Sequence, residues 1–135
     1  GGTIGGTYGG NALACAAGLE VLKLMDEGGL VKRSQEIGKK VMAAFNEMKE
    51  KYEVVGDVRG LGAMIGVEFV KDKKTKEPNP EFVGKFIQEC AKNGLLVENA
   101  GIYGNVIRFL APLVITDAQL DAGLEIYENA IKACM

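Results

Sequence analysis

The first ten residues of the chain have the composition of an anion-binding loop. They read GGTIGGTYGG, with six glycines in three pairs, and Asn11 follows where a helix N-cap is expected. Free backbone N–H groups ahead of a helix, together with the helix dipole, suit a phosphate group. The loop lacks the Gly-Lys-Ser/Thr of a Walker A motif and the Gly-x-Gly of a dinucleotide fingerprint. A flexible linker is the alternative, although Thr7-Tyr8 between the glycine pairs is not typical of linkers.

Arg108 is the second residue whose setting suggests chemistry. Strand alternation places it on the same face as Val106 and Leu110. A guanidinium in such a setting must be paired or must bind an anion, because burying it unpaired is costly. The alternatives to anion binding are a salt bridge with Glu68 or Glu98, or an edge-strand position that reaches water.

The remaining charged residues are weaker candidates. Arg59 precedes Gly60-Leu61-Gly62 and is interpreted as a surface residue at the end of a hairpin. The lysines fall on polar helix faces or in the charged loop 71–77, and none has the apolar setting that would lower its pKa for Schiff-base chemistry.

Composition excludes several classes of function. The chain has no histidine, which excludes Ser-His-Asp catalysis and His-ligated zinc within it, so chemistry must come from other side chains or a cofactor. Its three cysteines are far apart and form no Cys-x-x-Cys pair, so we expect neither a zinc site nor a disulfide framework, and we predict a reducing, cytoplasmic setting. The net charge of −2 gives no reason to expect nucleic acid or an anionic membrane as a partner. No apolar run reaches the roughly 18–20 residues that a membrane-spanning helix needs.

Four helices and four strands are predicted to position these residues. Helices are expected from Asn11 to Gly28-Gly29, over about 30–52, from Asn79-Pro80 to Asn93-Gly94, and after the capping box that begins at Thr116. The predicted strands are Val54–Arg59, Ala63–Val70, Leu95–Glu98 and Val106–Leu110. This order predicts an α+β fold, with a small, mostly antiparallel sheet and helices packed on one face.

Three segments in this order resemble class III aminotransferases, which are fold-type I pyridoxal-phosphate enzymes. They are Gly6–Asn11 (GTYGGN), Asp57–Glu68 (DVRGLGAMIGVE) and Tyr103–Arg108 (YGNVIR). The third segment, with Pro112-Leu113 and Ile115-Thr116-Asp117 after it, is most similar to the C-terminal stretch of 4-aminobutyrate aminotransferases.

The resemblance implies a role for each candidate residue. Thr7, with Gly6 beside it, would bind the cofactor phosphate of the other subunit of a homodimer, and Arg108 would bind the substrate carboxylate. The Schiff-base lysine would precede this chain, which would then contain no catalytic residue and be inactive alone.

The resemblance also implies an organisation and a reaction. Residues 1–29 would be an interface loop and helix that join a large domain absent from this chain, and residues 30–135 would be the C-terminal small domain. The complete enzyme would move an amino group from an ω-amino acid, with 4-aminobutyrate as the expected donor, to the oxo acid 2-oxoglutarate. The alternative is a free-standing α+β module that binds a ligand or dimerises without catalysis.

Overall fold

The computed structural model describes residues 5–135, which form two compact units. One unit ends at Arg33 and the other is Ser34–Met135. The predicted division after residue 29 concerns the complete protein and stays a prediction. None of the helices in the described part is long and apolar enough to cross a membrane.

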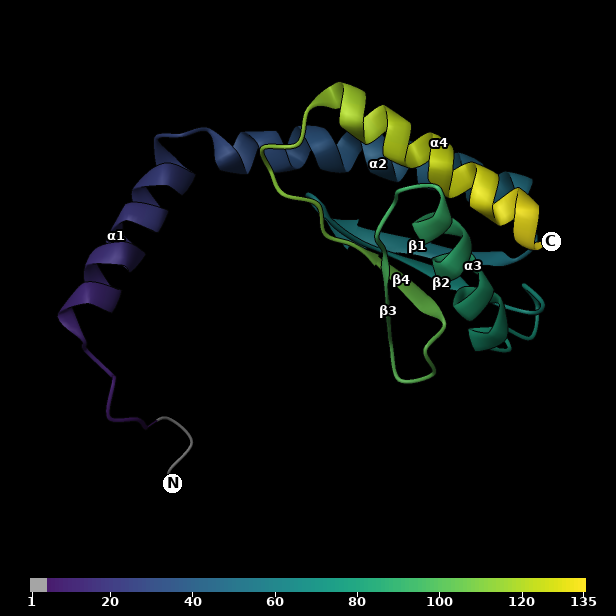
Figure 1. Ribbon diagram of the computed structural model, residues 1–135, viewed down its shortest axis with the longest axis horizontal. Coiled ribbons are helices and arrows are strands. Elements are labelled where there is room, and N and C mark those ends of the chain that lie inside the picture. The colour runs from purple at the N-terminus through teal and green to yellow at the C-terminus, as the bar shows by residue number, and fades with distance from the viewer. Residues whose placement is uncertain (1–4) are drawn as a thin grey trace. The chain divides into compact units, whose positions relative to one another are not determined.

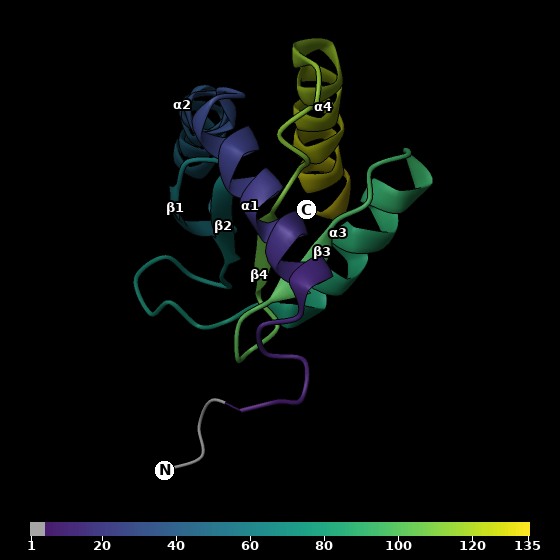
Figure 2. The same ribbon diagram turned by 90° about the vertical axis from the view of Figure 1, so that its left-hand side faces the viewer.

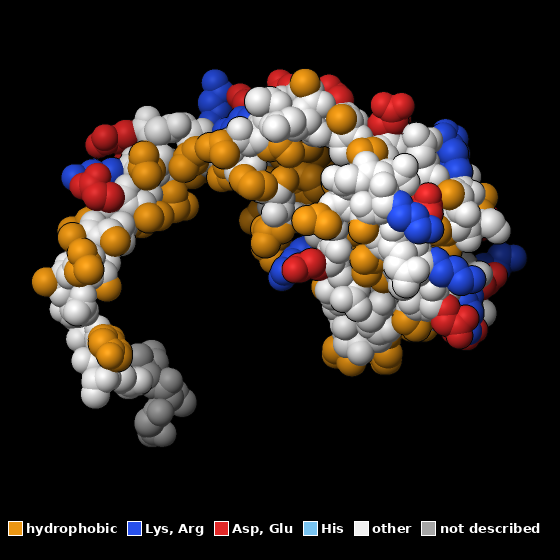
Figure 3. All heavy atoms as spheres, viewed as in Figure 1, with side chains coloured by type: hydrophobic (Ala, Val, Ile, Leu, Met, Phe, Trp, Pro, Cys, Tyr) orange, Lys and Arg blue, Asp and Glu red, His pale blue; other side chains and the backbone are white. Residues whose placement is uncertain are grey.

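The first unit consists of the glycine-rich loop and helix α1 (Ala12–Asp26). The predicted N-cap is confirmed, because the Asn11 side chain accepts a hydrogen bond of 3.1 Å from the Ala14 N–H. No residue of α1 is buried, and Leu13 and Leu22 are among its exposed apolar side chains. Figure 3 shows apolar side chains at the surface along this helix. A helix that is apolar on this scale normally packs against other protein.

The second unit is an α+β layer, as the sequence predicts (Figure 1). Its four strands form one antiparallel sheet in the order β1-β2-β4-β3. The elements are α2 (Leu30–Lys51), β1 (Val55–Leu61), β2 (Met64–Phe69), α3 (Pro80–Lys92), β3 (Glu98–Ala100), β4 (Val106–Phe109) and α4 (Asp117–Cys134). The predicted caps are also present: Asn79 caps α3, and Thr116 forms a capping box with Gln119 at the start of α4.

Helices α2, α3 and α4 pack on one face of the sheet and enclose the core (Figures 1 and 2). Three aromatic rings lie at its centre, where the Tyr127 centroid is 4.7 Å from those of both Phe45 and Phe86. The Tyr127 hydroxyl is buried without a hydrogen-bond partner among the described residues, and burial raises its pKa well above the usual value. The other large, fully buried side chains come from both helices and strands: Phe69, Ile37, Ile65, Ile107, Ile131, Val41, Val55, Val67, Val70 and Val83.

The hairpin between β1 and β2 turns later than predicted. Strand β1 continues through Gly60 and Leu61, and the chain reverses at Gly62, whose φ is +55°. The turn is held to α2, since the Ala63 N–H donates to the Ser34 hydroxyl oxygen at 3.0 Å. Gly38 of α2 lies so close to this turn that a Cβ there would be 2.2 Å from the Gly62 carbonyl oxygen.

The third strand also lies elsewhere than predicted. Strand β3 is Glu98–Ala100, so it starts where the predicted strand Leu95–Glu98 ends. The N–H of Leu95 donates to the Cys90 carbonyl at the end of α3, at 2.9 Å. This part of the chain therefore completes the helix terminus before any ladder begins.

Asn105 fastens the start of β4 to the end of β2. It is 3% exposed, and its side-chain amide donates to the Phe69 carbonyl at 3.0 Å. The Phe69 N–H donates in turn to the Asn105 carbonyl at 2.7 Å. The pairing of β4 with β2 thus begins at a point where both polar partners are satisfied.

Candidate functional site

The sheet face turned away from the helices, here called the open face, carries the charged residues of the candidate site. One row of residues runs across all four strands, because Arg59 pairs with Gly66, Gly66 with Arg108, and Arg108 with Glu98. Residues paired directly across strands lie on the same face of a sheet. Gly66 has no side chain, so the row leaves space between the two arginines.

Arg108 lies on this open face, as the alternation predicts. Its side chain is 45% exposed, and its Nη2 is 3.3 Å from Oε2 of Glu98, whose own side chain is 80% exposed. Of the two salt bridges considered as alternatives to anion binding, the one with Glu98 is present and the one with Glu68 is not, since Glu68 pairs with Arg59. An exposed ion pair of this length is worth roughly 0–1 kcal/mol. The Arg108 guanidinium can consequently exchange this partner for another carboxylate at little cost.

Two clefts meet at Arg108. One, of about 550 Å³, lies over the open face and is lined by Leu61, Met64, Ala100 and Val106 as well as by the two arginines of the row. The other, of about 450 Å³, lies beside the start of α4 and is lined mainly by apolar side chains from β4, the segment before β3, and α4. A cleft with mostly apolar walls and an arginine in its lining suits a small molecule that carries a carboxylate and a short aliphatic chain.

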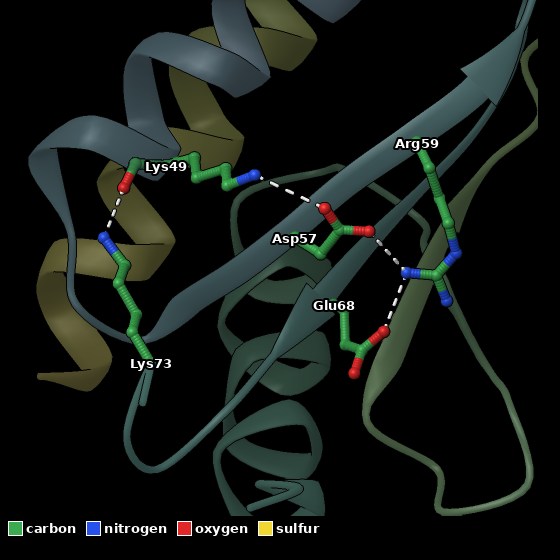
Figure 4. Close-up of polar contacts among 5 residues, drawn as sticks. All are labelled: Lys49, Asp57, Arg59, Glu68 and Lys73. Atoms are coloured by element: carbon green, nitrogen blue, oxygen red, sulfur yellow. Dashed lines mark hydrogen bonds and ion pairs between the residues drawn. The ribbon is translucent and has the colours of Figure 1, made fainter. Parts of the chain in front are cut away.

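Arg59 is held in an ion network (Figure 4). Its Nη1 is 2.7 Å from Oε2 of Glu68 and 2.9 Å from Oδ2 of Asp57, and Lys49 Nζ is 3.3 Å from the other oxygen of Asp57. Glu68, and after it Asp57, raise the pKa of Arg59. Burial acts to raise the pKa of Asp57, but hydrogen bonds from Arg59 and Lys49 outweigh it and leave the pKa lowered.

This network was not predicted from the sequence. Arg59 is at the surface, as expected, yet both of its carboxylate partners were missed. The two-residue spacing of Asp57 and Arg59 within one strand was the available signal, because it puts them on one face.

Gly6 and Thr7 lie in an exposed turn of the first unit. The Gly9 N–H donates to the Gly6 carbonyl at 3.2 Å, and the Asn11 N–H donates to the Tyr8 carbonyl at 3.0 Å. The N–H groups of Thr7 and Tyr8 have no hydrogen-bond partner among residues 5–135. Two neighbouring free N–H groups and a hydroxyl are donors that fit a phosphate oxygen. Thr7 and Arg108 belong to different units.

The chain matches the family described as "Aminotransferase class-III" over residues 1–131. Among curated proteins, the chain is 47% identical over 132 residues to a probable 4-aminobutyrate aminotransferase of Bacillus subtilis, covering 98% of this chain and 30% of that protein. It is 46% identical over 125 residues to a 5-aminovalerate aminotransferase of Pseudomonas aeruginosa, covering 93% of this chain and 29% of that protein. An alanine/serine racemase of Pyrococcus horikoshii is 42% identical over 122 residues, which cover 90% of this chain and 25% of that protein.

Similar solved structures include aminotransferases as well. An aminotransferase from Bacillus anthracis superposes with a TM-score of 0.85 at 30% identity, covering 94% of this chain and 29% of that one. An amine transaminase from an uncultivated Pseudomonas species, in its PLP-bound form, superposes with a TM-score of 0.83 at 32% identity, covering 98% of this chain and 30% of that one. The chain therefore spans less than a third of the length of these proteins.

Proposed function

We infer the function of this chain from its family, because the chain belongs to the class-III aminotransferases. We propose that the complete protein moves an amino group from an ω-amino acid, with 4-aminobutyrate as the preferred donor, to 2-oxoglutarate. The names of two curated relatives, which refer to 4-aminobutyrate and 5-aminovalerate, support a donor with its amino group at the end of the chain. We propose further that it works as a cytoplasmic homodimer, of which residues 30–135 are the small domain.

Pyridoxal phosphate is the cofactor in this proposal, and it supplies an electron sink when bound. The hydroxyl and N–H of Thr7, next to Gly6, would donate to its phosphate in the other subunit. The donors available in the Gly6-Thr7 turn support this role. The Schiff-base lysine would lie in the large domain, so we expect this chain alone to be inactive. Borohydride reduction with pyridoxal phosphate, followed by digestion, would show one stoichiometrically labelled lysine if that expectation is wrong.

One observation carries the substrate assignment: Arg108 is a half-exposed arginine beside the apolar walls of the open-face cleft, and its ion pair with Glu98 is exposed and exchangeable. A planar guanidinium binds a carboxylate through two parallel hydrogen bonds, which fix both the position and the orientation of the substrate. Arg108 would thus hold the carboxylate end of the donor, and that of the oxo acid in the reverse half of the reaction.

The test replaces Arg108 by lysine in the complete enzyme, which keeps the charge and removes the two-point geometry. We expect kcat/KM for 4-aminobutyrate to fall by about 2–4 kcal/mol in transition-state stabilisation, while cofactor binding stays unchanged. An alkyl amine without a carboxylate should lose little, because it presents nothing for Arg108 to hold. The measurement is the ratio of the two losses, taken from single turnovers of the donor half-reaction, which needs no oxo acid.

Glu98→Gln is the matched control, because it removes the same ion pair from the other side. If Arg108 binds substrate, Glu98→Gln leaves kcat/KM for 4-aminobutyrate within about twofold, as expected for loss of an exposed pair. If Arg108 is structural, both variants lower the melting temperature alike and Arg108→Lys impairs both donors equally, and the substrate role is then wrong.

Thr7 is tested by its effect on cofactor retention. Thr7→Ala removes a hydrogen bond to a charged group, so the affinity of the complete enzyme for pyridoxal phosphate should fall by roughly one to two orders of magnitude. Dimers formed from one Thr7→Ala subunit and one subunit lacking the Schiff-base lysine test the action across the interface. One of their two sites should carry both defects and the other neither. Unchanged cofactor affinity would leave Thr7 as a turn residue only.

A further inference from the structure

Glu68 lies within reach of two arginines. It pairs with Asp57 on one side and with Val106 on the other, whereas Arg59 and Arg108 both pair with Gly66, two residues away on the same strand. Both arginines are therefore diagonal neighbours of Glu68 on the open face. Such neighbours are about 7–8 Å apart, which long side chains can bridge. The register thus offers the Glu68 carboxylate two diagonal partners, one on each neighbouring strand.

Arg59 takes this carboxylate in the structure. The distance from Arg59 Nη1 to Glu68 Oε2 is 2.7 Å, and the Glu68 side chain is only 27% exposed. Arg59 is itself oriented by Asp57, which Lys49 holds from the other side (Figure 4). Arg108 is left with Glu98, whose side chain is 80% exposed and whose Oε2 is 3.3 Å from Arg108 Nη2.

We propose that Arg59 is a positioning residue for the carboxylate site at Arg108. By binding Glu68, it keeps the Glu68 carboxylate off the Arg108 guanidinium and leaves that group open to the substrate. The proposal rests on the substrate role of Arg108 put forward above, and it adds that the availability of Arg108 is set two strands away from β4, on β1.

The physical reason is competition between carboxylates. Glu98 is 80% exposed, so its ion pair with Arg108 is screened by solvent and competes little. Glu68 is 27% exposed and tethered beside Arg108, so once released by Arg59 it would compete more strongly with a substrate carboxylate that must come from solution. The open face also becomes more negative without Arg59: Asp57, Glu68 and Glu98 against Arg59 and Arg108 sum to −1, and removing Arg59 gives −2. Both effects weaken the binding of a substrate carboxylate, and neither weakens the binding of an alkyl amine, which is a cation at neutral pH.

The test is Arg59→Gln in the complete enzyme, with rescue by Glu68→Gln in the same chain. Arg59→Gln should raise KM for 4-aminobutyrate about fivefold, the size of effect that one surface ion pair can have, with kcat changed less than twofold. The alkyl amine should be unaffected. Adding Glu68→Gln should bring KM back close to the wild-type value, because the competing charge is then gone.

Asp57→Asn, added to Arg59→Gln, is the matched control. It removes the other carboxylate that Arg59 holds, with the same change of charge, but on β1, with β2 between it and β4. We expect it to restore KM much less than Glu68→Gln does, because it lowers the negative charge but does not remove the carboxylate that competes for Arg108. Where Arg59→Gln lowers the melting temperature, Arg59→Lys provides a second variant, whose ammonium can hold one carboxylate and should raise KM less.

Three results would overturn the proposal: no change of KM in Arg59→Gln, equal rescue by Asp57→Asn and Glu68→Gln, or equal losses for the carboxylate donor and the alkyl amine. The Arg108→Lys experiment distinguishes a failure of the substrate role of Arg108 from a failure of the positioning role of Arg59. If Arg108→Lys does not discriminate between donors, both the substrate role and the positioning role fall. If it does and Glu68→Gln does not rescue, only the positioning role falls.

Discussion

The two faces of the sheet differ in what their side chains do. On the covered face, Ile65, Val67 and Ile107 are buried against three helices, and the aromatic cluster at Phe86 is fully enclosed. On the open face, Leu61 is 88% exposed, and the row from Arg59 to Glu98 carries charge. Because side chains alternate along a strand, the same few residues of backbone serve both faces.

This division means that stability and recognition can be altered separately. Substitutions on the covered face should change the free energy of unfolding, and those on the open face should change binding with little loss of stability. A substitution on one face that changed both the free energy of unfolding and the binding of substrate would contradict this separation.

The largest expected effect is that of Phe86→Ala. Phe86 is fully buried and its ring contacts Phe69 and Tyr127, so its removal leaves a cavity and should cost about 3–5 kcal/mol of unfolding free energy. Leu61→Ala, on the open face, should cost less than about 0.5 kcal/mol. Denaturant titration of both variants measures the contrast. Similar losses in the two would mean that the open face is covered by other protein.

Two glycines, one in α2 and one on the open face, allow the same comparison with smaller expected changes in stability. Alanine at Gly38 would put a Cβ 2.2 Å from a backbone oxygen, so the turn at Gly62 must move, and we expect a loss of about 1–3 kcal/mol. Alanine at Gly66 would meet Val106 Cγ1 at 3.4 Å, which is ordinary contact, so its stability should change by less than about 0.5 kcal/mol. Thermal melts compare the pair, and a costly Gly66→Ala would contradict the view that the open face is tolerant.

The smallest effect concerns an ion cluster on the helical side. Hydrogen bonds from Lys51 and Tyr52 lower the pKa of Glu128 from 4.5 to about 2. A carboxylate whose pKa is lower in the folded state contributes stability above its unfolded pKa and loses it as the pH falls. Between about pH 5 and pH 2 the wild type should therefore lose about 1–2 kcal/mol that Glu128→Gln does not lose, after allowance for solvent screening. Unfolding titrations across that range, with parallel slopes for the two proteins, would refute it.

Local signals in the sequence were enough for much of the fold. Asn11, Asn79 and Thr116 each predicted a helix start correctly, since a cap depends only on residues three positions apart. Alternation placed Arg108 on the correct face for the same reason.

Features that depend on pairing between distant segments were harder to predict. The sequence could not show that Glu68 is held by Arg59 rather than by Arg108, because that outcome depends on the register between strands, which is set by the packing of the whole layer. The misplaced third strand has a local cause instead: Leu95 closes α3 through a hydrogen bond to Cys90, five residues before it. The sequence shows which residues are charged, but their ion-pair partners became clear only from the pairing of the strands.

The buried Asn105 has a consequence for errors in folding. Strands have a repeat of two residues, so a slip of β4 by one position would turn Ile107 outward and drive Arg108 into the apolar core. Asn105 disfavours such a slip, because the slipped register would lose the buried hydrogen bond from its amide to the Phe69 carbonyl. The Asn105 side chain therefore stabilises one register of β4 over the others, and that register is the one that exposes Arg108 to the solvent.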